Sequence, residues 1–233
     1  MSSFSLTMLT SLSPSYTAAS IPPSPVEMKE DPLKEYIIEG NVETVRDAMA
    51  IVYLDDHSSQ EQQAFNAGIL EGYYQEGDGI WVEDWENSSF SKMLRYPPLS
   101  LTSSLQNKEI SIKGWLSPEL QEKLKNLVKE AYREATMDTE STDLAERVEL
   151  PKSKADQIGA EFFPSSQACL IEKTNNWIEH KSSNSSRLHI FAGRHHGNPY
   201  LEKNPFKPQV QQFIQNLSKT NFLIIDFYKK EYR

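Results

Sequence analysis

The sequence contains one cysteine, few glycines and no long apolar run. Cys169 has no partner for an intrachain disulfide, and a single cysteine excludes a zinc knuckle built from several. Hydrophobic residues make up 38% of the 233 positions, yet no apolar run approaches the roughly 20 residues that cross a bilayer. We therefore expect no transmembrane segment and one sizeable core, for which a single domain is the default.

Basic residues are also in short supply. The chain has 24 Lys and Arg against 33 Asp and Glu, which gives a net charge of -9 and a pI near 5.1. Nucleic-acid binding needs a basic surface, so this balance argues against a nucleic-acid partner. A small molecule or a peptide is the ligand that we expect instead.

The start of the chain lacks charge altogether. Its first 26 residues contain no charged side chain and eight serines, with several prolines among them. Such a segment buries too little to order itself, so we predict a disordered Ser/Pro-rich leader over residues 1–30 and a single α/β domain over 31–233. A Sec signal peptide fits poorly, because no Lys or Arg precedes Lys29. A cytoplasmic and a secreted location both stay open, as does export by a specialised secretion system.

Apolar runs and helical spacings alternate along the rest of the chain. Strand patterns cover residues 48–54, 79–82, 110–115, 188–192 and 222–227. Helical patterns cover residues 59–76, 117–132, 144–150, 167–180 and 208–217. The alternation predicts an α/β fold with a mostly parallel sheet and helices on both faces.

The strongest helix signal begins at Ser117. A capping serine, Pro118 at the first helical position and Glu119 in the first turn mark the start of the helix. One apolar stripe follows, made of Leu120, Leu124, Leu127, Val128, Ala131 and Tyr132. We expect this stripe to lie in the core.

Polar clusters follow three of the predicted strands. They are Asp55, Asp56 and His57 after the first, Glu83 and Asp84 after the second, and Arg194, His195 and His196 after Gly193 at the end of the fourth. Ligands bind beyond the carboxyl ends of parallel strands, so neighbouring strands would bring these side chains into one cleft. Carboxylate and imidazole groups suit divalent metals and acid–base catalysis, and imidazole also ligates haem iron.

Each cluster also has a structural interpretation. Asp56 and its serine neighbours could cap the next helix, Glu83 and Asp84 could form a solvated loop, and adjacent histidines on a loop are often simply exposed. His189 lies inside a strand pattern, His180 lies at a helix end and Cys169 lies in an apolar pattern. We expect structural roles for these three.

The order of these motifs resembles the TraB/ChaN/erythromycin-esterase-like group, also called the haem-binding-uptake and Tiki superfamily. The matching segments are residues 50–63 (AIVYLDDHSSQEQQ), 80–84 (IWVED), 110–115 (ISIKGW) and 191–196 (FAGRHH). His57, Glu83 and His196 stand at the histidine, glutamate and late histidine places of the group, with Gly193 at its fixed glycine. Leu54 and Asp55 replace the glycine and glutamate of the first motif.

The resemblance implies a hydrolase that acts on an ester or an amide, with metal-assisted or acid–base chemistry. Asp55 or Glu83 would activate water, and Arg194 would stabilise an anion. His57 and His196 would bind a metal or move protons, with His195 at the rim; the expected cofactor is a divalent metal or haem. Two alternatives are a haem- or ligand-binding protein without catalysis and an exported interaction protein.

The GRHH segment carries a further geometric expectation. Gly193 should allow a sharp turn or the close approach of a ligand. Because side chains alternate along an extended backbone, we expect His196 to face Glu83 and His57 while His195 turns aside.

Overall fold

The computed structural model describes residues 33–56, 58–102, 105, 110–137, 152–180, 186–202, 204 and 206–228. The predicted leader, the predicted helix over residues 144–150 and His57 lie outside these residues.

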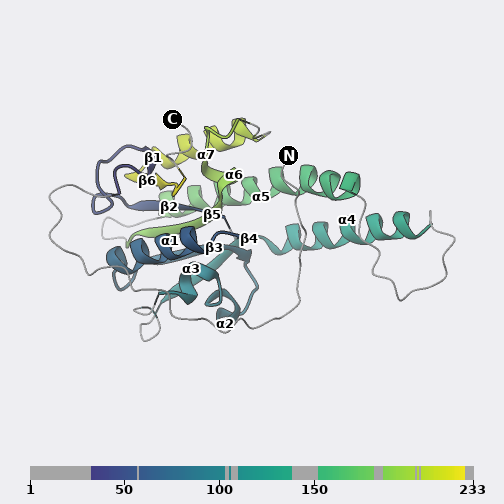
Figure 1. The fold of residues 1–233 in the computed structure, drawn as a ribbon, viewed down its shortest axis with the longest axis horizontal. Coiled ribbons are helices and arrows are strands. Elements are labelled where there is room, and N and C mark those ends of the chain that lie inside the picture. The colour runs from purple at the N-terminus through teal and green to yellow at the C-terminus, as the bar shows by residue number, and fades with distance from the viewer. Residues whose placement is uncertain are drawn as a thin grey trace.

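One six-stranded sheet forms the centre of the molecule (Figure 1). Its strands are β1 (Ile37–Gly40), β2 (Ala50–Asp55), β3 (Gly79–Trp85), β4 (Ser111–Leu116), β5 (Leu188–Gly193) and β6 (Phe222–Ile225), in the spatial order β1-β6-β2-β5-β3-β4. Strand β1 runs antiparallel to β6, and the other neighbouring pairs are parallel. The predicted fold class is confirmed, and β1 is an addition that the short, half-buried segment IIEG did not signal.

Both faces of the sheet are covered, which explains why β2 is buried along its whole length. Ile51 and Tyr53 pack on one face with residues of α1 (Gln60–Tyr73) and α3 (Pro97–Ser100). Val52 and Leu54 point to the other face and pack with residues of α5 (Lys152–His180) and α7 (Lys207–Leu217). The alternation of side chains along a strand thus divides one apolar run between two cores.

Two predicted helix starts are confirmed by their caps. The Ser59 hydroxyl accepts the backbone N–H of Gln62 at 3.3 Å at the start of α1. The Ser117 hydroxyl accepts the N–H of Leu120 at 3.2 Å at the start of α4 (Pro118–Met137). Each cap satisfies a donor that has no partner within the helix.

Three segments differ from the prediction. The irregular stretch before β4 contains two single-turn helices, α2 (Phe90–Met93) and α3. Helix α5 starts at Lys152 instead of residue 167 and runs through Pro164. The segment RHHG is a helical turn, α6 (Arg194–Gly197), and not extended chain.

Helices α4 and α5 run side by side and extend together beyond the sheet (Figure 1). Because this part of α5 packs mainly on another helix, it needs no long apolar stripe, and its polar sequence concealed it. The stripe of α4 is likewise only partly covered: Leu120 and Ala131 are buried, Leu124, Leu127 and Val128 are half-buried, and Tyr132 is exposed. The expectation that the whole stripe lies in the core is therefore wrong.

None of the helices in the described ranges is long and apolar enough to cross a membrane.

Candidate functional site

The carboxyl ends of β2, β5 and β3 lie next to one another, so the three polar clusters meet at one edge of the sheet. Asp55 is in register with Gly193. The backbone N–H of Gly193 donates to Oε2 of Glu83 at 2.7 Å. The strand order therefore brings together residues that are more than a hundred positions apart in the sequence.

Glu83 and His196 form the centre of this site. Nε2 of His196 lies 3.4 Å from Oε1 of Glu83, without a hydrogen bond of regular geometry. The imidazole is buried and meets the edge of the Trp115 ring at a centroid distance of 5.2 Å. Glu83 keeps 16% of its side chain exposed, so the pair is reached from solvent on the Glu83 side.

Gln167 of α5 fixes the tautomer of His196. The side-chain nitrogen of Gln167 donates to the backbone carbonyl oxygen of His196 at 3.1 Å. The amide oxygen of Gln167 therefore faces the ring and lies 2.6 Å from Nδ1 of His196. An amide oxygen only accepts, so Nδ1 must carry the proton. In a neutral ring, Nε2 then presents its lone pair to Glu83.

His195 precedes His196 on the same helical turn, so the alternation of an extended backbone, from which its orientation was predicted, does not apply. Its ring is half-buried and stacks on Phe163 of α5 at a centroid distance of 6.0 Å. Burial, and then the neighbouring His196 and Arg194, lower the pKa of the His195 imidazole, while Glu83 acts in the opposite sense. The ring is held neutral.

Asp55 is almost fully buried, at 2% exposure, and accepts the Tyr96 hydroxyl at 2.8 Å. Burial, and then the charges of Asp55 and Glu83, raise the pKa of Tyr96 well above its usual value. The phenol therefore stays protonated and remains a donor to Asp55. The Tyr96 ring in turn packs edge-on against Phe191 of β5.

Arg194 extends toward the end of β6. Its Nε lies 3.3 Å from Oδ2 of Asp226, and its guanidinium lies 4.7 Å from the centroid of the Tyr228 ring. Asp226 is fully buried and also accepts the side-chain amide of Asn198 at 2.7 Å. This arrangement fixes the position of the arginine while leaving 18% of its side chain exposed.

Gly193 has φ -56° and ψ 150°, an ordinary extended conformation, so no sharp turn depends on it. A Cβ built there would lie 3.2 Å from Oε2 of Glu83. The close approach that the glycine allows is thus that of the Glu83 carboxylate.

The structural interpretations hold for several other residues. Asp56 accepts the backbone N–H and the hydroxyl of Ser58. Asp84 accepts the N–H of Trp85 and the hydroxyl of Ser88, but it lies with Glu83 inside β3, so the loop interpretation of these two residues is wrong. His189 is buried between the Tyr53 hydroxyl at 2.9 Å and Asp78 at 3.3 Å. His180 is exposed at the end of α5.

Sequence reasoning missed Tyr96, Gln167, Trp115 and Asp226. Asp226 directly follows the apolar run of β6, so the rule that found Asp55 could also have found it. Tyr96 comes from the bend before α3, Gln167 from α5 and Trp115 from the interior of β4, and nothing local to them marks their contacts with the site.

No group of three or more His, Cys, Asp or Glu within the described residues is arranged to hold a metal ion. His57, which the sequence placed among the ligands, is outside these residues.

No protein-family profile matches the chain, and no curated protein matches it in sequence. Among solved structures, a ChaN protein of Campylobacter jejuni, described as binding haem cofacially, shares 9% sequence identity with it. The match covers 77% of this chain and 81% of that chain, with a TM-score of 0.42.

Proposed function

We propose that the edge formed by β2, β5 and β3 binds a small molecule, and that Glu83 and His196 transfer a proton during hydrolysis of an ester or an amide. The observation behind this proposal is the pair itself: Nε2 and Oε1 lie 3.4 Å apart, with the far side of the ring tied to Gln167.

Two acceptors that face each other repel unless something positive lies between them. A lone pair on Nε2 and an ionised Glu83 carboxylate are stabilised by a shared proton or by a cation. A pair that holds and releases one proton at a site open to solvent is equipped for general acid–base catalysis. Glu83, which is partly exposed, would take the proton from water and share it with the buried Nε2 of His196, and would then return it to the leaving group.

The neighbouring residues have supporting roles in this proposal. Arg194, held by Asp226 and Tyr228, would stabilise the oxyanion that develops on the substrate. Asp55 would act by holding Tyr96 in place, because its Oδ2 accepts that hydroxyl. His57 remains a candidate for a second imidazole at the site.

A divalent cation is the alternative partner for the pair. Glu83 and His196 supply one oxygen and one nitrogen donor, and ligating histidines are commonly oriented through their second nitrogen, as Gln167 orients this one. Bound there, a cation would polarise the substrate carbonyl. Its further ligands would be His57, water or the substrate.

Haem binding without catalysis is the second candidate function, and His195 is the residue that favours it. A half-buried imidazole that is kept neutral beside the aromatic ring of Phe163 can donate a nitrogen to iron. His196 is less suited among the described histidines, because the Glu83 carboxylate covers its Nε2.

Hydrolysis of p-nitrophenyl esters and anilides by the full chain tests the first proposal, with and without a chelator. We expect Glu83→Gln and His196→Asn each to lower kcat/KM by about 100-fold or more, the range typical of a general acid or base. His180→Asn, at an exposed histidine, is the matched control and should change it less than about twofold. Loss of activity in the presence of the chelator would show that a divalent cation, and not a shared proton, lies between Glu83 and His196. Absence of activity in the wild type would overturn the proposal. Activity in all three variants equal to that of the wild type would overturn it as well.

Haem titration, followed through the Soret band, tests the second candidate function, haem binding. His195→Ala should remove the ligand-field signature of a coordinated histidine, whereas His180→Ala should retain it. An unchanged spectrum in His195→Ala would exclude this residue as the ligand.

A further inference from the structure

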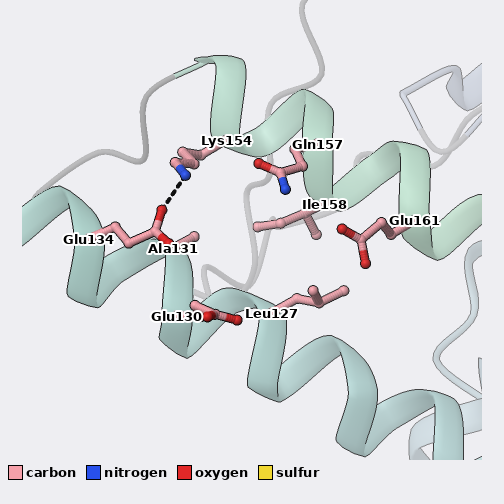
Figure 2. Close-up of a pocket in the computed structure, with 8 residues that line it drawn as sticks. All are labelled: Leu127, Glu130, Ala131, Glu134, Lys154, Gln157, Ile158 and Glu161. Atoms are coloured by element: carbon pink, nitrogen blue, oxygen red, sulfur yellow. Dashed lines mark hydrogen bonds and ion pairs between the residues drawn. The ribbon is translucent and has the colours of Figure 1, made fainter.

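A hollow of about 180 Å³ lies between α4 and α5, where the two helices extend beyond the sheet. Figure 2 shows the side chains of Leu127 and Ile158 pointing into the gap from opposite helices. Ile158 and Ala131 are buried there, and Leu127 is half-buried. The hollow therefore has an apolar floor supplied by both helices.

Acidic side chains surround this floor. Glu130 and Glu134 come from α4, and Glu161 comes from α5. Glu134 forms an ion pair with Lys154. Within the described residues, neither Glu130 nor Glu161 forms an ion pair, so the rim carries net negative charge from both helices.

We call Leu127, Ala131, Ile158, Glu130 and Glu161 the α4–α5 groove, and we propose that it binds a basic amphipathic segment of a partner protein. One large apolar side chain of the partner would fill the hollow, as the anchor residue does when a helix docks into a groove. Lys or Arg residues flanking that anchor would reach Glu130 on one helix and Glu161 on the other.

The negative charge around the groove favours a basic segment as its occupant. A second copy of the chain would bring another acidic surface, since the whole chain has a net charge of -9. A basic segment instead gains electrostatic attraction and covers apolar surface that α5 alone leaves open on α4. The groove is built from other residues than Glu83 and His196, so this inference does not depend on the proposed function.

A fluorescent synthetic helix with leucines on one face and lysines on the other is a suitable probe, and its anisotropy with the full chain reports binding. We expect saturable binding that weakens when salt rises from about 0.1 to 1 M, because the screening length falls from about 10 to 3 Å. A peptide with glutamate in place of lysine should not bind.

Charge-reversal variants distinguish binding at the groove from attraction to the net charge of the whole chain. Glu130→Lys combined with Glu161→Lys should raise Kd by about tenfold or more. Glu172→Lys combined with Glu179→Lys changes the net charge equally at exposed positions of α5 outside the groove, and should raise it less than about twofold. Ile158→Ala should weaken binding without altering its dependence on salt.

Equal weakening in the two double variants, or no saturable binding of the basic peptide, would overturn the proposal. Sedimentation tests for a second copy as the occupant. A wild-type dimer that becomes a monomer in the Glu130→Lys and Glu161→Lys double variant would also overturn the proposal, because the groove would then join two copies of this chain.

Discussion

At the scale of single residues, the site depends on groups that hold other groups in position. His196 is fixed on one side by the Gln167 amide and faces Glu83 on the other. Glu83 is fixed by the backbone N–H of Gly193, and Arg194 by Asp226. Preorganised contacts of this kind place reactive atoms without a cost of rearrangement when a substrate binds.

Gln167→Ala tests this positioning, on the basis of the proposed function. The variant leaves Glu83 and the imidazole in place but frees the ring to rotate and to change tautomer. We expect kcat/KM to fall about 10- to 100-fold, as for other residues that orient a functional histidine, with a shifted pH profile. The free energy of unfolding should fall by about 1–3 kcal/mol, because the buried Nδ1 loses its acceptor. Gln121→Ala, on α4, is the control. A pH profile identical to that of the wild type would show that the amide does not set the tautomer.

At the scale of elements, the two long helices have two different environments. The start of α4 lies against the sheet core with Leu120, whereas its later turns pack on α5. A hydrophobic stripe of uniform appearance in the sequence therefore contributes unevenly to stability.

Leu120→Ala and Leu127→Ala make that difference measurable by urea unfolding. Leu120 is 5% exposed, so its truncation should cost about 2–5 kcal/mol, as cavity-forming changes do. Leu127 is half-buried and lines an existing hollow, so its truncation should cost about 1 kcal/mol or less. Equal costs would mean that the outer part of α4 is packed as tightly as the core.

At the scale of the whole molecule, buried titratable groups link stability to pH. Burial lowers the pKa of His189 from 6.5, although the hydrogen bond with Asp78 acts against it. For Asp78, burial acts to raise the pKa, but hydrogen bonds from His189 and from backbone N–H groups outweigh it and lower the pKa from 3.8. In both cases the unfolded chain binds protons more readily than the folded one.

Stability should therefore be complete above about pH 6.5 and fall as the pH drops below it, first through His189 and later through Asp78. The His189 contribution approaches about 1.4 kcal/mol for each pH unit while the folded ring stays neutral. Urea unfolding between pH 7 and 5 measures this slope, which His189→Gln should reduce. His195→Gln controls for the other imidazole whose pKa is lowered. An NMR titration in which His189 protonates near pH 6.5 in the folded protein would contradict the prediction.

The Ser/Pro-rich start of the chain remains a prediction at this scale. Deleting residues 1–25 should lower Tm by less than about 4 °C, because a charge-free segment of this composition makes few core contacts. Differential scanning calorimetry of the full and shortened chains measures the difference. A larger fall would show that the segment docks on the domain.

The sequence by itself determined five of the strands, two helix starts and the strand ends where polar side chains gather. Apolar runs located the five parallel strands, serine caps located two helix starts, and polar residues after strands marked Asp55, Glu83 and Arg194. These are local properties, since a run of neighbours sets strand burial and a cap bonds within three residues. The same rule extended to β6 would have marked Asp226.

Only the tertiary structure decided which of these residues meet. The order β2-β5-β3 puts His196 against Glu83, 113 positions away, and α5 brings Gln167 to the far side of the ring. The extension of α4 and α5 beyond the sheet is likewise invisible in their sequences, because an amphipathic stripe shows that a face is apolar but not what covers it. Strand order and helix partners depend on contacts between distant segments, which periodicity within one segment cannot encode.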